Sequence, residues 1–268
     1  QHIYHIVATY PLHSSLATVY RYINAGYSQV SRIDLPRAVK FKPRRKYLAP
    51  GIPPECKKGR TYDCFLNFIA DYEFREWLEM DTVIGRTGGK VLLTFTFTNG
   101  NFIFSRLCEN KSAEAIASQM VALKAQLRTC GFRFGDLFPL VLTDNGSEFK
   151  KVDELELTLD EDGFLVYRTS LYYCDPMASW QKGCIEKNHE FIRYAVPKGK
   201  SLNPYTQEDM TLLMNHINSV KRPGLGNKSP YELVEEDDED FKALMSLLKM
   251  HLIPPDEVHL MPDLFVKK

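Results

Sequence analysis

The feature that most constrains the fold is a series of strand-like segments that begins near residue 77. The segment WLEMDTVIG at 77–85 alternates in polarity, and KVLLTFTFT at 90–98 is rich in β-branched and aromatic side chains. The turn signal NGN at 99–101 separates this second run from a third, FIFSRLC at 102–108. These runs predict three consecutive antiparallel strands.

The segments that follow predict two more strands and several helices. The strands, FPLVLTD at 138–144 and RTSLYYC at 168–174, are short and apolar, and the first is typical of a buried parallel strand. Apolar periodicity and capping residues predict helices at 112–131, 179–196, 206–220 and 237–250. The order of these segments is typical of an α/β domain.

The first 35 residues predict two short helices joined by a tight turn. Pro11 ends the first helix, Ser14 or Ser15 begins the second, and Gly26 ends it. The pair fits a helix-turn-helix, whose second helix enters the DNA major groove, or else an ordinary αα-hairpin. In the first case the residues expected to face DNA are Ser15, Thr18 and Arg21.

Charge is distributed unevenly, although the chain of 268 residues has a formal net charge of zero. Residues 1–60 hold eleven Lys or Arg and only two acidic residues, which indicates a nucleic-acid partner unless these charges merely form a solvated face. Residues 36–62 are rich in Pro and basic side chains and predict an extended linker. The linker residues expected to contact phosphates are Arg44, Arg45 and Lys46. The acidic run YELVEEDDED at 231–240 predicts solvated surface.

Composition argues against a zinc site and a membrane protein. The six cysteines form no CxxC pair, so we expect reduced thiols and no structural zinc. No apolar run approaches the ~20 residues of a membrane span, and the N-terminal segment lacks the features of a signal peptide. Because the chain does not begin with Met, we expect it to lack part of its N-terminal portion.

Three carboxylates occupy positions that suggest chemistry. Asp81 lies in the middle of the first predicted strand, Asp144 ends the fourth, and Glu186 lies in the first turns of the helix at 179–196. If the first and fourth strands are neighbours, the three acids can converge, and their mutual repulsion then requires a cation. Carboxylate oxygens suit Mg²⁺ or Mn²⁺, and two such ions can promote displacement at phosphorus.

Several segments resemble those of bacterial insertion-sequence transposases of the IS30 family. The resemblance is carried by EMDTVIG (79–85), LTDNGSEF (142–149) and YCDPMASWQKGCIEKNHEFIRYAVPKG (173–199). Its further matches, to the family's helix-turn-helix region and C-terminal motif, are TVYRYINAGY (18–27), DLPR (34–37) and NSVKRPGLGNKSPYE (218–232). The motifs follow the expected order through nearly the whole chain.

The resemblance implies an RNase-H-like integrase core, with a mixed five-stranded sheet flanked by helices and an Asp-Asp-Glu triad that binds two Mg²⁺ or Mn²⁺ ions. Matched motif by motif, the triad is Asp81, Asp144 and Glu186. The implied activity is cleavage of double-stranded DNA at transposon ends, followed by transfer of the 3′-OH strands into target DNA. Synapsis of two ends implies a homodimer or higher oligomer on DNA, and the implied location is the bacterial cytoplasm, at the nucleoid.

The implied organisation divides the chain into four parts. These are a helix-turn-helix segment at 1–35, the basic linker at 36–62, the catalytic domain at 63–203 and a C-terminal helical extension with the acidic run at 204–268. The 41 residues between Asp144 and Glu186 exceed the number in the thirties that is common in such cores. The excess is predicted as a surface hairpin at 155–168, with DEDG as its turn.

Side chains near the triad have two interpretations each. Lys182 and Arg193 share one predicted helix face with Glu186 and Glu190, so they contact DNA phosphates or pair with the glutamates. The remaining candidates, which would orient a metal ligand or touch DNA, are Glu148, Asn145 and His189. For His189 we favour simple packing, because the acids already suffice as ligands.

Two other functions compete with this interpretation. One is a DNA-binding regulator that no longer cuts DNA, and the presence of all three acids argues against it. The other is a general RNase-H-like nuclease, which the helix-turn-helix and the transposase motifs disfavour. Cleavage of end-containing DNA in the presence of Mg²⁺ or Mn²⁺ distinguishes the three.

Overall fold

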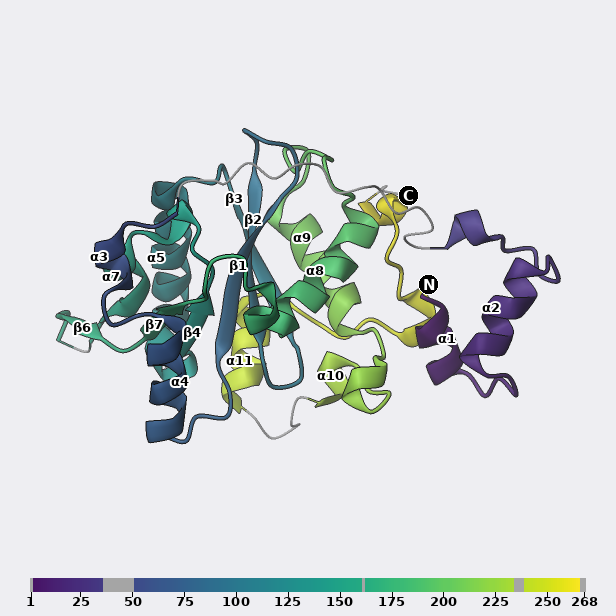
Figure 1. Ribbon diagram of the computed structural model, residues 1–268, viewed down its shortest axis with the longest axis horizontal. Coiled ribbons are helices and arrows are strands. Elements are labelled where there is room, and N and C mark those ends of the chain that lie inside the picture. The colour runs from purple at the N-terminus through teal and green to yellow at the C-terminus, as the bar shows by residue number, and fades with distance from the viewer. Residues whose placement is uncertain (1, 36–50, 161, 234–238, 266–268) are drawn as a thin grey trace.

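A computed structural model describes residues 2–35, 51–160, 162–233 and 239–265 (Figure 1). Its centre is a five-stranded mixed sheet in the order β3-β2-β1-β4-β7. The strands are β1 Leu78–Ile84, β2 Val91–Phe97, β3 Ile103–Cys108, β4 Leu140–Thr143 and β7 Ser170–Tyr173. β1, β2 and β3 are antiparallel, whereas β4 is parallel to both β1 and β7. The predicted α/β class, with a mixed five-stranded sheet flanked by helices, is confirmed.

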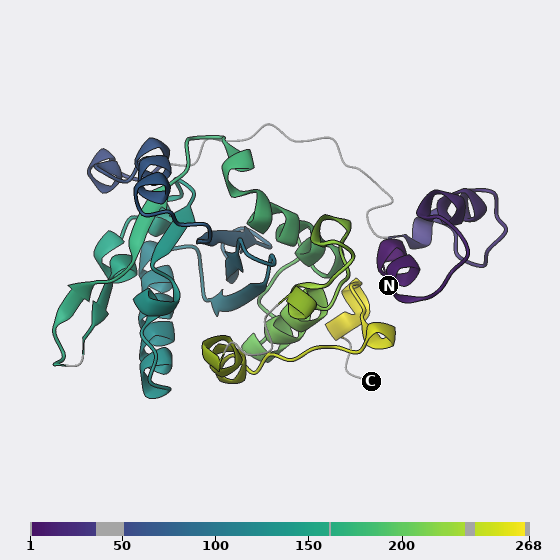
Figure 2. The ribbon, with the colours of Figure 1, turned by 90° about the horizontal axis from the view of Figure 1, so that it is seen from below.

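Helices cover both faces of the sheet. α5 (Ala113–Thr129) lies on one side of the antiparallel strands, and α8 (Gly183–Ala195) and α9 (Gln207–Asn218) lie on the other (Figures 1 and 2). Ser112 caps α5, as predicted, because its side chain accepts a hydrogen bond from the Ala115 N–H. The other α-helices between residues 51 and 265 are α3 Pro54–Lys57, α4 Tyr62–Asp71, α6 Phe134–Leu137, α7 Val152–Glu156, α10 Pro230–Leu233 and α11 Glu239–Leu247.

One hydrophobic core joins the sheet to its helices. Phe95 in β2 stacks on Phe104 in β3, with ring centroids 4.7 Å apart, and both rings are fully buried. Met210, Leu213 and Ile217 of α9 belong to the same cluster of buried residues. The predicted boundary at residue 203 therefore does not coincide with a break in the core, because α9 packs directly on β3.

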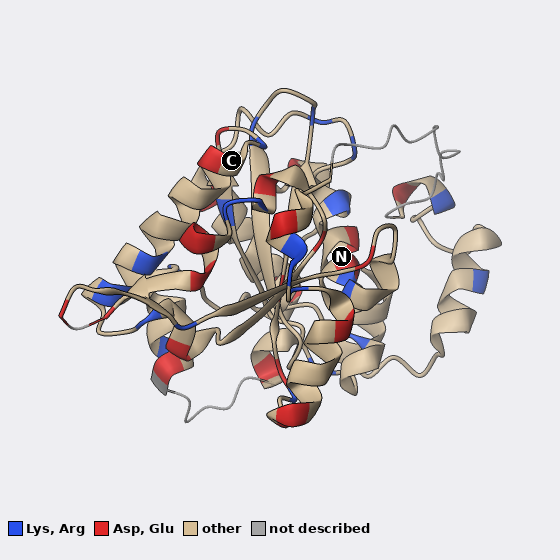
Figure 3. Ribbon diagram, turned by 60° about the vertical axis from the view of Figure 1, so that its left-hand side comes forward, with Lys and Arg blue, Asp and Glu red and all other residues tan. Residues whose placement is uncertain are grey.

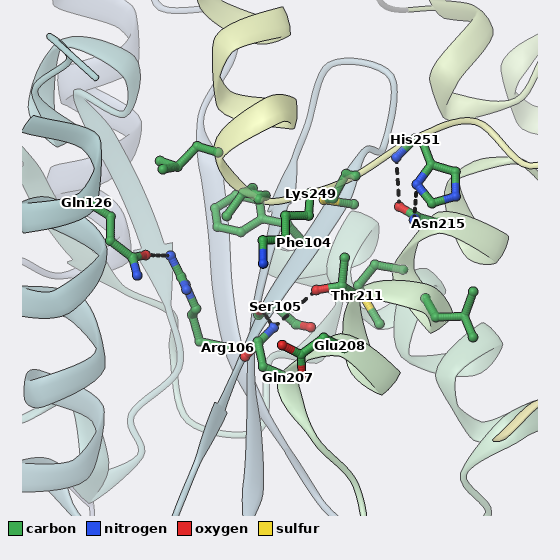
Figure 4. A pocket seen from close by; sticks show the side chains of 15 residues that line it. Phe104, Ser105, Arg106, Gln126, Gln207, Glu208, Thr211, Asn215, Lys249 and His251 are labelled. Atoms are coloured by element: carbon green, nitrogen blue, oxygen red, sulfur yellow. Dashed lines mark hydrogen bonds between the residues drawn. The ribbon is translucent and has the colours of Figure 1, made fainter. Parts of the chain in front are cut away.

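Side chains from α9 satisfy the outer edge of β3. The Asn218 side-chain amide accepts a hydrogen bond from the Ile103 N–H and donates one to the Ile103 carbonyl, at 2.9 and 2.7 Å. The Gln207 amide accepts from the Leu107 N–H and donates to the Ser105 carbonyl, at 2.8 and 2.9 Å. Beside this edge lies a pocket of about 290 Å³ whose lining contains none of the predicted site residues (Figure 4).

The opposite edge of the sheet, at β7, is satisfied in a similar way. The Leu171 N–H donates to the Glu156 carboxylate at 3.0 Å, and the Tyr173 N–H donates to the Arg60 carbonyl at 2.9 Å. Arg60 and Glu156 also form an ion pair at 2.7 Å. The segment around Arg60 is therefore packed against the sheet.

The predicted linker divides into two parts. Residues 36–50, with Arg44, Arg45 and Lys46, lie outside the described residues. Gly51 forms a β-bridge with Gly146, and the Ile52 N–H donates to the Asn145 carbonyl at 3.2 Å. The chain from residue 51 onward thus lies against the loop that follows Asp144.

The structure tests two local predictions, the hairpin at 155–168 and the helix at 179–196. The hairpin predicted at 155–168 is present as β5 (Leu157–Leu159) paired with β6 (Leu165–Tyr167). The prediction that an α-helix begins at Ser179 is wrong for the first turn. Residues Ser179–Lys182 form a 3₁₀ turn, and α8 begins only at Gly183.

The N-terminal segment consists of α1 (Ile3–Thr9), α2 (Leu16–Asn24) and a 3₁₀ turn at Arg32–Asp34. Ser15 caps α2 by accepting a hydrogen bond from the Thr18 N–H. His5 docks α1 on the rest of the protein: its Nδ1 accepts from the Lys221 N–H, so its Nε2–H donates to the Pro255 carbonyl. The two predicted helices and their turn are confirmed as structure.

Candidate active site

Asp81 and Asp144 lie side by side on neighbouring parallel strands. β1 and β4 pair in a register that places Met80 opposite Thr143, so the next residues of both strands are adjacent. One oxygen of each aspartate accepts a backbone hydrogen bond, from the Thr82 N–H to Asp81 at 2.6 Å and from the Gly146 N–H to Asp144 at 2.9 Å. The Asn-Gly turn therefore orients Asp144, and the predicted proximity of the two acids is present.

Lys182 neutralises this pair of carboxylates. Its Nζ lies 2.8 Å from Asp81 Oδ2, and the lysine is only 3 % exposed. Burial is the largest single effect on Asp81 and opposes its charge, but neighbouring positive charge, chiefly Lys182, and the hydrogen bonds from Lys182 and the Thr82 N–H together lower the pKa of Asp81. Burial, followed by repulsion from Asp81, raises the pKa of Asp144. The two aspartates are therefore inequivalent, and a buried ammonium provides the positive charge next to them.

Glu79 is a buried acid that sequence reasoning missed. It lies two residues before Asp81 and hence on the same face of β1. Its Oε2 accepts a hydrogen bond from the Ile185 N–H at 2.7 Å, so a carboxylate from β1 caps the start of α8. Burial raises the pKa of Glu79 to about 7. The signal in the sequence was the alternation Glu79, Asp81, two acids on one face of a strand whose other face is apolar.

His189 lies close to Asp81 but does not contact its carboxylate. Thr94 Oγ1 donates its hydrogen to the Asp81 carbonyl at 3.0 Å, so His189 Nε2–H must donate to Thr94 Oγ1, at 2.8 Å. Burial lowers the pKa of His189 to about 4, and the imidazole is neutral at physiological pH. This hydrogen bond links α8 to β2, and the packing role that we favoured for His189 stays a prediction.

Glu148 and Asn145 brace the loop that carries Asp144. Glu148 is buried, accepts a hydrogen bond from Thr82 Oγ1 at 2.9 Å and pairs with Lys111 at 3.0 Å. Asn145 donates its side-chain N–H to the Cys174 carbonyl. A Cβ at Gly146 would lie 2.4 Å from a Glu148 carboxylate oxygen, so a side chain at this position would displace that carboxylate.

Glu186 does not join the two aspartates in this structure. It is exposed on the first turn of α8. Across the described parts of the chain, no group of three or more His, Cys, Asp or Glu side chains lies close enough together to hold a metal ion. The predicted third ligand is thus on the expected helix, but the three-carboxylate cluster is not assembled.

The residues predicted to contact DNA differ in their surroundings. Lys182 is buried against Asp81, and Arg193 donates to the Ile84 carbonyl at 2.9 Å, so neither pairs with a glutamate through these contacts. Ser15 and Thr18 form the cap of α2, and Arg21 is exposed one turn later. The ribbon in Figure 3 shows acidic and basic residues interspersed along the described chain, whereas most of the predicted basic linker lies outside it.

The donor set at Asp81 and Asp144 fits a hard divalent cation. Two adjacent carboxylates supply oxygen ligands, and the Lys182 ammonium occupies the place of the positive charge that they require.

Within the described residues no helix is long and apolar enough to cross a membrane.

Comparison with known proteins finds similarity to several transposases. It is 28 % identical over 155 residues to a transposase of insertion sequence IS4351 from Bacteroides fragilis, covering 58 % of this chain and 43 % of that protein. It is 27 % identical over 243 residues to a probable transposase of the insertion-like element IS1161 from Streptococcus salivarius, covering 86 % and 60 %. It is 28 % identical over 122 residues to the transposase InsI of IS30A from Escherichia coli strain K12, covering 46 % and 27 %.

These similarities confirm the resemblance to IS30-family transposases. The chain spans 60 % or less of the length of these relatives. No protein-family model matches the sequence. Among solved structures, the catalytic core domain of BIV integrase matches with a TM-score of 0.39 and 18 % identity, over 58 % of this chain and 91 % of that domain.

Proposed function

We propose that this chain, a relative of insertion-sequence transposases, is itself a DNA transposase that binds terminal inverted repeats, cleaves DNA at these ends and joins the 3′-OH strands to target DNA. The observation that carries the proposal is the pair Asp81 and Asp144, side by side on parallel strands and matched by a buried positive charge. Carboxylates in this arrangement suit metal-assisted phosphoryl transfer, which depends mainly on positioning and charge stabilisation.

In this proposal Asp81, Asp144 and Glu186 hold two Mg²⁺ or Mn²⁺ ions through their carboxylate oxygens. The ions, when bound, supply Lewis-acid stabilisation of the phosphoryl oxygens and activation of the attacking oxygen. The Thr82 and Gly146 N–H groups orient the two aspartates. Because Glu186 is exposed on α8, it reaches the aspartates only after its side chain or the start of the helix moves.

The remaining residues of the proposal bind DNA. The second helix of the N-terminal pair would contact the terminal repeat through Ser15, Thr18 and Arg21, and the basic segment with Arg44, Arg45 and Lys46 would contact the phosphate backbone. Lys182 and Arg193 flank the site on either side of Glu186 along the chain. Two ends held together require a dimer or higher oligomer on DNA.

The decisive experiment compares Asp144→Asn with Asp136→Asn on labelled end DNA in Mg²⁺ or Mn²⁺. Asp144→Asn should abolish cleavage and joining, because it removes one carboxylate of the pair. Asp136 is a partly exposed acid near the start of β4, 3.6 Å from Arg168, and its substitution should leave both reactions intact.

The cut positions and the binding isotherms separate the alternatives. Full cleavage by Asp144→Asn overturns the proposal. Binding of end DNA by the unsubstituted protein without metal-dependent nicking favours a DNA-binding protein that does not cut. Cleavage of unrelated RNA–DNA hybrids in place of end DNA favours a general nuclease.

A further inference from the structure

The Lys182 ammonium occupies a position that a divalent cation would share. It is one of the few lysines that the structure buries, and its Nζ lies 2.8 Å from Asp81 Oδ2. The other oxygen of Asp81 already accepts the Thr82 N–H at 2.6 Å. Both oxygens of Asp81 therefore have partners, and a cation that binds this carboxylate at Oδ2 competes with the ammonium for it.

We propose that Lys182 is a positioning residue that acts as an internal substitute for the metal, holding Asp81 and Asp144 together in the metal-free protein and leaving Asp81 when the divalent cation binds. This inference rests on the proposed function, because it assumes that the two aspartates are metal ligands. Two carboxylates on adjacent strands repel each other unless a positive charge lies near them, and the lysine supplies it.

The local structure allows Lys182 to leave without disturbing α8. Lys182 has non-helical backbone angles (φ −125°, ψ 53°) and precedes the helix. The next residue is Gly183, where even an added Cβ would meet no atom within 4 Å, so neighbouring groups leave this part of the backbone free to adjust. The helix itself is fixed by a separate contact, the hydrogen bond from the Ile185 N–H to Glu79.

The same displacement would prepare the site for its third carboxylate. Lys182 lies four residues before Glu186, and the segment between them contacts β1 through Lys182 at Asp81 and the Ile185 N–H at Glu79. While the ammonium satisfies Asp81, Glu186 stays exposed. Metal binding would therefore exchange an internal cation for an external one and create the need for one more acidic ligand.

The test measures Mn²⁺ affinity by isothermal titration calorimetry and thermal stability in chelator and in excess Mn²⁺, on the full chain without DNA. Lys182→Met should bind Mn²⁺ about tenfold more tightly than the unsubstituted protein, equivalent to about 1.4 kcal/mol, because no ammonium competes. In chelator its Tm should be lower, since Asp81 and Asp144 lose their neutralising charge, and Mn²⁺ should raise that Tm by more than it raises the unsubstituted protein's.

Two lysine variants serve as controls. Lys187→Met removes an exposed lysine of the same helix, paired with Glu190 at 2.9 Å, and should change neither Mn²⁺ affinity nor the metal-dependent Tm shift. Lys182→Arg keeps a cation and should keep the affinity close to that of the unsubstituted protein. A purely structural lysine would lower Tm equally with and without metal and leave Mn²⁺ affinity unchanged, which overturns the inference.

Two further measurements keep the result decisive. Asp144→Asn reports on the metal site itself: if it binds Mn²⁺ as well as the unsubstituted protein does, the proposed function fails, whatever Lys182 does. If Lys182→Met does not fold, NMR spectroscopy of the unsubstituted protein with ¹³C-labelled lysines replaces it. The Lys182 side-chain resonance is assigned as the one missing from Lys182→Arg, and it is followed while Mg²⁺ is added. A shift that saturates with Mg²⁺ supports displacement, and an unmoved resonance overturns it.

Discussion

The sheet and the N-terminal helix pair are stabilised in opposite ways. Phe95 in β2 is fully buried within a cluster of strand and helix residues. In the N-terminal segment, by contrast, Tyr27 is 80 % exposed and Ile33 is 86 % exposed, and buried residues are few. Its main fixed point is His5, which belongs to α1 but is hydrogen-bonded entirely to the C-terminal region. The sheet therefore supports itself, whereas the position of the helix pair depends on docking.

The largest expected difference concerns the core. Phe95→Ala should lower the free energy of unfolding by about 3–5 kcal/mol, because it leaves a cavity against Phe104. Urea denaturation followed by the fluorescence of Trp77, which packs beside the sheet, measures it. Tyr27→Ala is the comparison and should change that free energy by less than about 0.5 kcal/mol. Similar losses from both changes would mean that the two regions unfold as one unit.

A change of pH should have an effect of intermediate size on the docking of α1, through protonation of His5. Burial lowers the pKa of His5 below its usual 6.5, so the docked protein binds fewer protons than the undocked one. The docking contribution is therefore present above pH 6.5 and is lost as pH falls through the lowered pKa. Between about pH 7.5 and about pH 5, hydrogen exchange corrected for its intrinsic rate should show α1 losing protection while α5 keeps it.

The variant His5→Gln tests the origin of that pH dependence. A glutamine side chain can accept and donate hydrogen bonds but does not titrate, so most of the pH dependence of α1 should disappear. His2 packs against Phe191 and Tyr194 and has a pKa that burial also lowers, so His2→Gln should remove what remains. An unchanged pH dependence in both variants would assign it to another group.

The smallest expected effect compares two helix caps. Ser112 caps α5 in the catalytic region and Ser15 caps α2, each by accepting one backbone N–H hydrogen bond. Substitution by Ala should cost about 1 kcal/mol in either helix. For Ser112→Ala the loss should appear in global urea unfolding. For Ser15→Ala it should appear only as weaker hydrogen-exchange protection of α2, and an equal global loss would contradict the independence of the two regions.

Much of the sheet was predictable because strands obey local rules. Alternation, β-branched residues and the NGN turn located the strands, and the parallel neighbour of β1 brought Asp144 beside Asp81. The role of Lys182 was not predictable. A continuous helix from Ser179 would place it on the Glu186 face, but a 3₁₀ turn breaks the helical period before α8. Only the packing of that turn against β1 determines where the ammonium lies.

Local sequence patterns also could not predict how far the hydrophobic core extends. The order of the motifs suggested a C-terminal extension that begins after residue 203. Motif order does not show which helices pack on the sheet. In the structure α9 packs against β3, through apolar contacts and the two amides that face this strand. Sequence spacing cannot show that Gln207 and Asn218, at opposite ends of one helix, reach two points of the same strand edge.

Backbone groups at both edges of the sheet thus form hydrogen bonds within the chain. Side-chain amides of α9 are their partners at β3, and Glu156 and the Arg60 carbonyl are their partners at β7. An open edge is a template on which an identical chain can add a strand and begin to polymerise. In the assembly on two DNA ends that we propose, such a template would compete with the contacts that join the copies. Self-association through these two edges of the sheet would require α9 or Glu156 to detach first.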